Sequence, residues 1–228
     1  MSKILALDTS TDACSVALLL NGEVQEDFRV IPRQHTKQLL PMVEALLASA
    51  EISVSQLDAI AFGRGPGSFA GIRIATGVTQ GLAFAADLPV LPVSTLEALA
   101  LSAYRLEKAD RVVAALDARM DEIYVATYRM IDDMPQAIGV EQVCSPSSFV
   151  LEGEETYLGV GSGWRYLEDM HGEVQQRLQV SADTYYPSAA NILAIAERDF
   201  NQGITVAAED ALPVYLRDHV AWKKKDQQ

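Results

Sequence analysis

The apolar pattern of the chain begins with three short strand-like runs. They cover residues 3–7, 13–20 and 23–29. Asn21-Gly22 separates the second run from the third, and Asn-Gly is the strongest short hairpin signal because both central residues of the favoured turn need a positive φ. We therefore predict that the chain opens with an antiparallel meander.

Helical periodicity follows this meander. Apolar residues recur at helical spacing over 36–50 and predict a helix with one wide apolar face, whose early turns Pro41 is expected to bend. A brief apolar run at 59–63 predicts a strand, and a long helix is expected over 68–86. That helix contains Gly71, Gly77 and Gly81. Each glycine costs about 1 kcal/mol relative to alanine, so another feature must compensate.

A second series of strands begins near residue 111. Before it, a strand is expected at 90–93, followed by a helix at 95–105 that Ser94 and Glu97 cap. The later elements are strands at 112–116, 122–128 and 157–160, a helix from Ser188 to about Phe200, and a closing run at 212–216. This order predicts an α/β protein with two related halves, the second degenerate. The predicted segments are an N-terminal half at 1–100, a C-terminal half at 101–216 and a flexible basic tail at 217–228.

Composition and cysteine usage are those of an ordinary globular chain. With 228 residues, 49% of them hydrophobic and 21% charged, the chain can form a packed core without a disulfide or a metal. Its two cysteines, Cys14 and Cys144, are typical of small buried hydrophobic residues in a reducing compartment. Asp8 interrupts the first apolar run too early for a signal peptide, and no run is long enough to span a membrane. We therefore expect a cytoplasmic protein without a membrane partner.

Acidic residues outnumber basic ones by 31 to 18, which gives a formal net charge of −13. Such a field repels the phosphate backbone of nucleic acids, so we do not expect this chain to bind RNA on its own. Lys223-Lys224-Lys225 is the exception. We interpret it as a solvated tail rather than as a phosphate contact.

One candidate for chemistry is the turn formed by Asp8, Thr9 and Ser10 after the first strand. A turn of this kind can direct a carboxylate and backbone N–H groups at a phosphate or at its hydrated Mg²⁺. The alternative is a β-turn closed by local side-chain hydrogen bonds. Both interpretations stay open.

Other familiar catalytic patterns are missing from the sequence. Residues 63–68 are rich in glycine, but the chain has no Gly-Lys-Ser or Gly-Lys-Thr, so the lysine and the Mg²⁺-binding hydroxyl of a P-loop are missing. The glycines at 159–163 lack the last interval of the dinucleotide fingerprint. The three histidines are isolated from one another and from both cysteines, and no Gly-x-Ser-x-Gly motif occurs. The sequence therefore supports neither a zinc site nor a serine hydrolase.

Small residues repeat along one side of the helix predicted over 68–86. Gly77, Gly81 and Ala85 are four residues apart, and Ala70 lies on nearly the same face. Residues this small allow another helix to approach until the backbones touch. Two interpretations stay open, namely close packing against the protein's own sheet and a helix-to-helix interface with another subunit.

Three segments of the sequence, taken together, resemble one known family. They are Ile4–Ala17, Gly65–Arg73 and Pro213–Arg217, and the resemblance extends over nearly the whole chain. The sequence resembles the bacterial TsaB (YeaZ) family. The resemblance implies the actin-like fold of sugar kinases and Hsp70, an RNase H-like α/β architecture, which suits the two halves predicted above.

The same resemblance implies a role in tRNA modification. TsaB is a subunit of the machinery that makes threonylcarbamoyladenosine beside the anticodon; its paralogue TsaD carries the transfer chemistry, and TsaE is an ATPase partner. The resemblance implies a heterodimer with TsaD, a homodimer in isolation, and contact with tRNA only through the complex. It implies no cofactor held by this chain alone, with ATP or ADP expected at the interface of the complex.

The resemblance also identifies candidate residues. Where TsaD carries its pair of metal-binding histidines, this sequence has Thr95 and Leu99, neither of which can bind iron or zinc as an imidazole does. A paralogue that has lost these ligands can keep its surface but not its chemistry, so we expect a non-catalytic subunit without a metal. The two long helices of the first half are expected to pair with TsaD. The candidate interface residues are Arg73, Gly77, Gln80 and Gly81.

Three functions are therefore in competition. The first is a scaffold that binds and stabilises TsaD and positions it for tRNA. The second is an enzyme, either a nucleotide hydrolase or a peptidase acting on the paralogue. The third is a homodimeric regulator that is independent of tRNA.

Overall fold

Five strands form the sheet of the first lobe in the computed structural model, which describes residues 2–183 and 185–217. In chain order they are β1 (Ile4–Asp8), β2 (Ala13–Leu20), β3 (Glu23–Val30), β4 (Ala59–Gly65) and β5 (Val90–Ser94). The sheet order is β3-β2-β1-β4-β5, with antiparallel pairing among the first three strands and parallel pairing of β4 and β5. The predicted opening meander is confirmed, and Asn21 has the positive φ that its turn requires.

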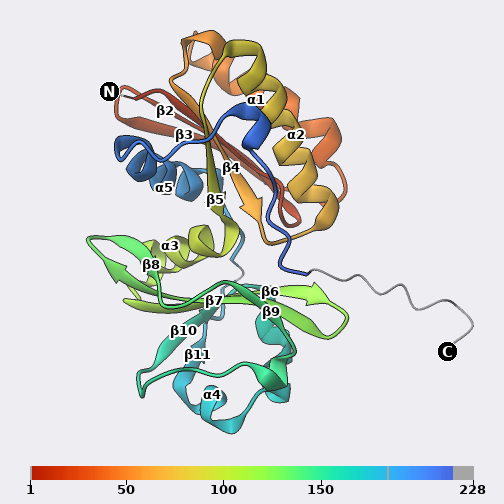
Figure 1. Ribbon diagram of the computed structural model, residues 1–228, viewed down its shortest axis with the longest axis vertical. Helices are drawn as coiled ribbons and strands as arrows, with labels where there is room; N and C mark the ends of the chain where they lie inside the picture. Colours follow the sequence, from red (N-terminus) through yellow and green to blue (C-terminus); the bar gives the residue numbers. More distant parts are fainter. Residues whose placement is uncertain (1, 184, 218–228) are drawn as a thin grey trace, which may run out of the picture.

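Helices cover both faces of this first sheet (Figure 1). They are α1 (His35–Ser49), α2 (Phe69–Ala86) and α5 (Ala189–Asn201). Side chains alternate along a strand, so Leu5 and Leu7 of β1 pack with α1 and α2, whereas Ile4 and Ala6 pack with α5. Burial on both faces explains why β1 is a continuous apolar run in the sequence.

Serine side chains fix the starts of two helices. Ser68 Oγ accepts the N–H of Gly71 in the first turn of α2. Ser94 Oγ accepts the N–H groups of Leu96 and Glu97 in the first turn of α3 (Thr95–Glu107). The helix starts that the sequence predicts near these two serines are confirmed.

A second sheet forms the core of the second lobe. Its strands are β6 (Arg111–Arg119), β7 (Glu122–Ile131), β8 (Met134–Ala137), β9 (Gln142–Cys144), β10 (Tyr157–Val160) and β11 (Leu178–Val180). The order is β11-β10-β6-β7-β8, and β9 pairs with β7. Helix α3 packs on one face, while the 3₁₀ segment Ser162–Asp169 and α4 (Gly172–Arg177) pack on the other.

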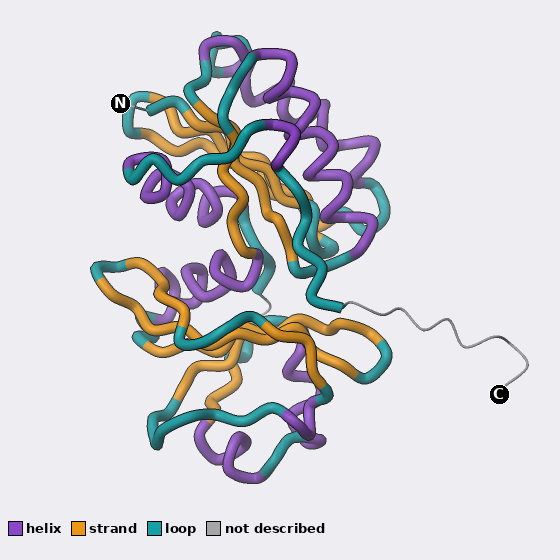
Figure 2. Tube along the Cα trace, in the orientation of Figure 1, coloured by secondary structure: helices purple, strands orange, loops and turns teal. Residues whose placement is uncertain are grey.

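The end of the described chain returns to the first lobe. After β11, the chain forms α5 on the first sheet, and residues 202–217 then follow a largely irregular path beside α2 toward the second lobe (Figure 2). Val206 forms an isolated antiparallel bridge with Val90 on this path. The segment 101–216, predicted as one half, thus supplies elements to both lobes.

Several short elements have no counterpart among the sequence predictions. Strands β8, β9 and β11 and helix α4 are 3–6 residues long and mostly exposed or half-buried, so no apolar periodicity marks them. The closing run at 212–216 has no regular secondary structure. The predicted basic tail lies outside the described residues, apart from Arg217. Within the described part of the chain, no helix is both long and apolar enough to cross a membrane.

Candidate functional site

The turn after β1 packs against the glycine-rich segment that precedes α2. Asp8 Oδ1 accepts hydrogen bonds from the backbone N–H and the hydroxyl of Ser10, at 3.0 and 2.9 Å. Thr9 Oγ1 donates to the Gly71 carbonyl at 2.7 Å, and the Ser68 N–H donates to the Ser10 carbonyl at 2.7 Å. The two bonds from Ser10 to Asp8 are the local side-chain hydrogen bonds of the β-turn interpretation, whereas the bonds with Gly71 and Ser68 tie the turn to the start of α2.

Glycines make this close packing possible. A Cβ atom at Gly63 would overlap Asp8 Oδ2, and one at Gly71 would overlap the Thr9 carbonyl oxygen. The acidic turn and the glycine-rich segment are therefore two sides of one packed junction. This close approach offsets the helical cost of Gly71.

The Asp8 carboxyl is isolated inside the junction. Its side chain is fully buried, and Oδ2 has no hydrogen-bond partner among the described residues. Burial raises the pKa of Asp8 to about 7, although the hydrogen bonds from Ser10 oppose this effect. Thr9 is buried as well, whereas Ser10 reaches the wall of a pocket. Nucleotide binding by these three residues stays a prediction, and of the three only Ser10 lines that pocket.

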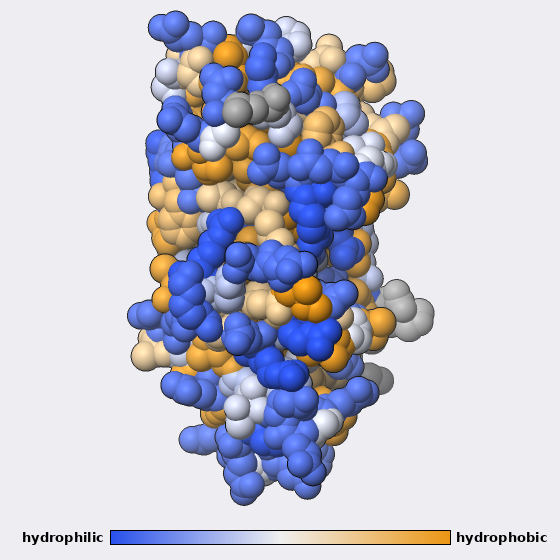
Figure 3. All heavy atoms as spheres, turned by 90° about the vertical axis from the view of Figure 1, so that its left-hand side faces the viewer, coloured by the Kyte–Doolittle hydropathy of each residue, from blue (hydrophilic) through white to orange (hydrophobic). Residues whose placement is uncertain are grey.

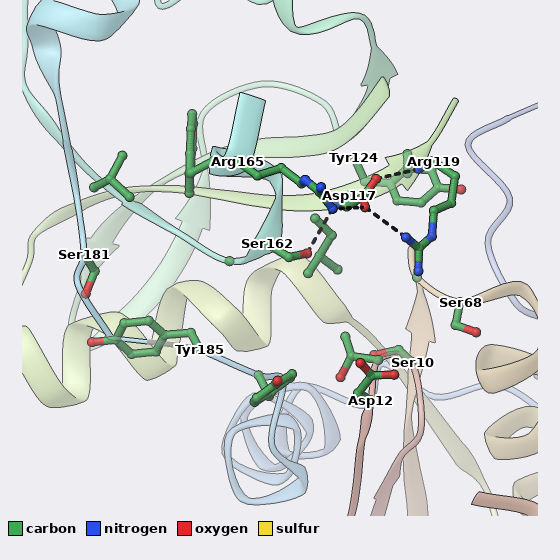
Figure 4. Close-up of a pocket in the computed structure, with 18 of the residues that line it drawn as sticks. Ser10, Asp12, Ser68, Asp117, Arg119, Tyr124, Ser162, Arg165, Ser181 and Tyr185 are labelled. Carbon is green, nitrogen blue, oxygen red and sulfur yellow. Dashed lines mark hydrogen bonds and ion pairs between the residues drawn. The ribbon is translucent and has the colours of Figure 1, made fainter. Parts of the chain in front are cut away.

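This pocket, of about 970 Å³, lies between the two lobes (Figure 4). Its lining includes Ser10 and Ser68 from the first lobe and three arginines, Arg119, Arg165 and Arg217. Asp117, on the second lobe, pairs with Arg119 at 3.3 Å and with Arg165 at 3.5 Å. Asp12 and Asp183 line the pocket as well, so its three guanidinium groups share the space with three carboxylates. Sequence analysis missed these arginines because they come from separate segments without a common motif.

Helix α2 presents a face of small and aromatic residues to solvent. Phe69 is 60% exposed and Phe84 is 79% exposed, and Gly77 and Gly81 lie exposed between them. A Cβ atom at either glycine would meet no atom within 4 Å, so the interpretation that they pack against the protein's own sheet is wrong. On the side of the molecule that Figure 3 shows, hydrophilic and apolar residues alternate over the surface.

Arg73 and Gln80 hold a C-terminal segment against α2. Arg73 Nε donates to the Tyr215 hydroxyl at 2.7 Å, and Gln80 Nε2 donates to the Ala211 carbonyl at 3.1 Å. Together with the two exposed glycines, these side chains share one side of the helix. Their role in a subunit interface stays a prediction. Sequence analysis missed the contact of Tyr215, which lies 142 residues from Arg73 along the chain and has no local signal.

Thr95 and Leu99 lie one turn apart in α3, and both are fully buried. Leu99 belongs to the core of the second lobe, and Thr95 Oγ1 has no hydrogen-bond partner in the described structure. Over residues 2–183 and 185–217, no group of three or more histidine, cysteine, aspartate or glutamate side chains is arranged to hold a metal ion.

The chain forms two α/β lobes with a pocket between them, and the sheet of each lobe opens with a hairpin. This arrangement defines a protein of the actin-like class. Residues 29–225 match the family model of TsaD, tRNA N6-adenosine threonylcarbamoyltransferase. The chain is 42% identical to the tRNA threonylcarbamoyladenosine biosynthesis protein TsaB of Haemophilus influenzae, over 97% of this chain and 96% of the relative. It is 43% identical to the Escherichia coli protein of the same name, over 97% of each.

A solved structure agrees with these sequence relatives. YeaZ from Pseudomonas aeruginosa matches the fold with a TM-score of 0.90 at 48% sequence identity, covering 95% of this chain and 100% of that chain. The chain therefore belongs to the TsaB family, as its sequence motifs predicted.

Proposed function

We propose that this chain is a scaffold subunit in the biosynthesis of threonylcarbamoyladenosine in tRNA, and that it binds and stabilises a transferase of the TsaD family. The names of its TsaB relatives support the pathway, and the match to the TsaD family model supports a common fold for this chain and the transferase. In this proposal the partner carries out the transfer, an ATPase of the TsaE kind completes the machinery, and tRNA is reached only through the complex.

The observation that carries the proposal is the exposed pair Gly77 and Gly81. In the isolated chain, each glycine lowers the stability of α2 by about 1 kcal/mol without any packing contact in return. A partner helix that crosses α2 here gains a backbone approach that larger side chains would prevent. Phe69 and Phe84, exposed at the two ends of this face, become buried in the same contact.

Helix α1 widens this surface. It lies beside α2 on the same face of the first sheet (Figure 1), and its Leu40 is 44% exposed. A partner with the same fold presents an equivalent pair of helices. A second copy of this chain presents them too, so a symmetric homodimer competes for the surface when the partner is absent.

The chain itself is assigned no catalytic step in this proposal. Thr95 and Leu99 occupy the positions at which the family resemblance places the metal-binding histidines of TsaD, and both are buried. The Asp8 carboxyl is enclosed in the junction after β1 and does not line the pocket. We therefore expect no threonylcarbamoyl transfer by this chain alone.

Threonylcarbamoyl transfer to unmodified tRNA tests the proposal. The TsaD-family transferase, the ATPase, the activated threonylcarbamoyl donor and ATP are assayed without the chain, with the wild type, and with a Gly77→Leu, Gly81→Leu variant. Transfer should require the wild type and fall by about tenfold or more with the variant, because the leucines hold the helices apart. If transfer proceeds equally well without the chain, the scaffold function is wrong.

Gly172→Leu is the matched control for this assay. Gly172 is also an exposed helical glycine at which an added Cβ atom would meet nothing within 4 Å, but it lies in α4 of the second lobe. Transfer should be unchanged by this substitution. A loss equal to that of the double variant would mean that leucines on any exposed helix disturb the protein.

Nucleotide binding is the second candidate function, and it rests on the pocket of about 970 Å³ between the lobes, which arginines and aspartates line together. Arg119 and Arg165 present guanidinium groups to the space between the lobes. Calorimetric titration with ADP and ATP tests this candidate, and an Arg119→Gln, Arg165→Gln variant should lose the binding. Release of phosphate by the pure chain would favour the hydrolase, and cleavage of the TsaD-family partner would favour the peptidase.

A further inference from the structure

Residues 211–217, here called the strap, join the exposed side of α2 to the second lobe. The strap has no regular secondary structure and runs beside α2 (Figure 2). Its first residue, Ala211, accepts the hydrogen bond from Gln80, and the Val214 N–H donates to the Arg64 carbonyl at 2.8 Å. Two backbone groups of the strap are therefore fixed to the first lobe.

The last described residue of the strap is tied to the second lobe. Arg217 Nε donates to the Glu122 carboxylate at 3.1 Å, and a terminal nitrogen pairs with the same carboxylate. Arg217 also donates to the Arg119 carbonyl at 3.3 Å. The Arg217 side chain is only 17% exposed, so this ion pair is screened by water less than a surface pair. The strap is thus held at both ends.

Tyr215, between these two ends, forms a stack with two residues of α2. The Arg73 guanidinium carbon lies 3.8 Å from the centre of the Phe69 ring and 5.6 Å from the centre of the Tyr215 ring. The two rings are 5.8 Å apart, and Tyr215 is 43% exposed. Arg73 lies one helical turn before Gly77, so the stack continues the glycine face of α2.

Arg73 has no acidic partner within the described part of the chain. None of the ion pairs found there includes it, although the chain has 31 acidic residues. Its Nε is bonded to Tyr215, and its two terminal nitrogens make no hydrogen bond to a described residue. A guanidinium that packs over the Phe69 ring and is bonded to the Tyr215 hydroxyl presents its two terminal nitrogens as a planar pair of donors, the geometry that a carboxylate accepts.

We propose that the Phe69, Arg73 and Tyr215 stack is a docking anchor that receives a carboxylate side chain of the partner subunit, and that Arg217 positions this anchor by tying the strap to the second lobe. The partner is the TsaD-family transferase, so the inference rests on the proposed function. Two observations carry the assignment: the Arg73 charge has no acidic partner among the described residues, and the stack continues the glycine face of α2. Tyrosine and arginine are also the residues in which interface hot spots are enriched.

Calorimetric affinity for the transferase, measured over a range of salt concentrations, tests the anchor. Arg73→Met should weaken binding by about tenfold and reduce its dependence on salt, because the variant loses a charge-assisted pair. Arg73→Lys should retain the salt dependence while losing part of the affinity, since it keeps the charge but not the planar donors. Tyr215→Ala should weaken binding as Arg73→Met does, because it releases the guanidinium from its fixed orientation.

Arg217→Gln tests the positioning role. It should weaken binding several-fold although Arg217 is not on α2, and it should speed amide exchange in the strap of the isolated chain by about tenfold. Arg111→Gln is the matched control, because it removes an exposed ion pair, with Glu155 at 3.3 Å, from the same lobe. The control should change neither the affinity nor the exchange of the strap.

The outcomes separate the anchor from the scaffold function. If the Gly77→Leu, Gly81→Leu variant abolishes binding while Arg73→Met and Tyr215→Ala leave affinity and salt dependence unchanged, the anchor is wrong and the scaffold function stands. If the wild type does not bind the transferase, both are wrong. If Arg73→Met weakens binding but Arg217→Gln alters neither affinity nor exchange, the positioning role of Arg217 is wrong.

Discussion

At the scale of single residues, Asp8 ends the first apolar run of the sequence, and its carboxyl is fully buried in the structure. Ser10 donates both of the hydrogen bonds that the carboxyl receives from described residues, and both go to Oδ1. Oδ2 faces the backbone of Gly63 without a donor. A charge held there is poorly solvated, and the pKa of Asp8 rises to about 7. A side chain that the sequence marks as a candidate ligand for Mg²⁺ is therefore a titrating group of the interior.

Asp8→Asn should stabilise the fold in alkaline solution. The Asp8 pKa is about 7 in the folded chain, compared with an ordinary value of 3.8. Protonated Asp8 therefore favours the folded state at low pH, and its contribution to the free energy of unfolding is lost as the pH rises through 7. Asparagine carries no charge and keeps an acceptor for Ser10. The variant should gain roughly 2–4 kcal/mol over the wild type at pH 8.5, and this gain should shrink toward pH 4. Denaturant unfolding at both pH values measures it, and an equal difference at both would contradict the assigned pKa.

At the scale of the element, α2 shows that glycines of one helix can serve different purposes. Gly71 is buried against the turn after β1, where no Cβ atom fits, whereas Gly77 and Gly81 face open space. All three look alike in the sequence. Helical periodicity shows which residues belong to one helix, but it does not show which other parts of the protein each residue contacts. Only the packed structure assigns the first glycine to the fold and leaves the other two for a partner.

Alanine substitutions should separate these purposes. Gly71→Ala should destabilise the chain by about 1–3 kcal/mol, because the overlap with the Thr9 carbonyl outweighs the better helix propensity. Gly77→Ala should stabilise the isolated chain by up to about 1 kcal/mol, since nothing opposes the propensity gain. Urea unfolding of the two variants measures the difference. If Gly77→Ala were as harmful as Gly71→Ala, this part of α2 would have to be packed in the free chain.

Elements with a local signal were predictable from the sequence. The Asn21-Gly22 hairpin and the helix capped by Ser94 follow from the conformational preferences of a few adjacent residues, and both are confirmed. Strand β11 is only three residues long and has no such signal, because its pairing with β10 is decided by tertiary packing. The contact between Arg73 and Tyr215 was not predictable for the same reason.

At the scale of the whole molecule, the pocket depends on how the two lobes are held. Ser10 and Arg119 line it from different lobes, and no pattern within either segment fixes their separation. Three ion pairs cross between the lobes in the described part of the chain: Arg217 with Glu122, Arg64 with Glu141 at 3.4 Å, and Arg198 of α5 with Glu97 of α3 at 3.1 Å. The actin-like class could be predicted from the motifs and the strand order, whereas the lining of the pocket could not, because it depends on these long-range contacts.

Glu141→Ala should show how strongly the ion pair between Arg64 and Glu141 holds the lobes together. The Glu141 carboxylate, whose side chain is 14% exposed, accepts the Ser94 hydroxyl, the Tyr128 hydroxyl at 3.3 Å and the Arg64 guanidinium. Its removal leaves the buried Tyr128 hydroxyl without this acceptor and Arg64 without its counter-charge. The free energy of unfolding should fall by about 2–3 kcal/mol, and amide exchange in β4 and β7 should accelerate.

Tyr128→Phe removes one hydroxyl and leaves the ion pair in place, so it should have a smaller effect than Glu141→Ala. Both variants are compared by urea unfolding and amide exchange. Arg111→Ala breaks an exposed ion pair within the second lobe and serves as the reference. If Glu141→Ala lowers the free energy of unfolding by no more than Arg111→Ala does, the ion pair between Arg64 and Glu141 does not hold the lobes together. In that case the strap, the Arg198–Glu97 pair and the packing of α3 against α5 would carry the connection, and pocket geometry would be more sensitive to Arg217 than to Glu141.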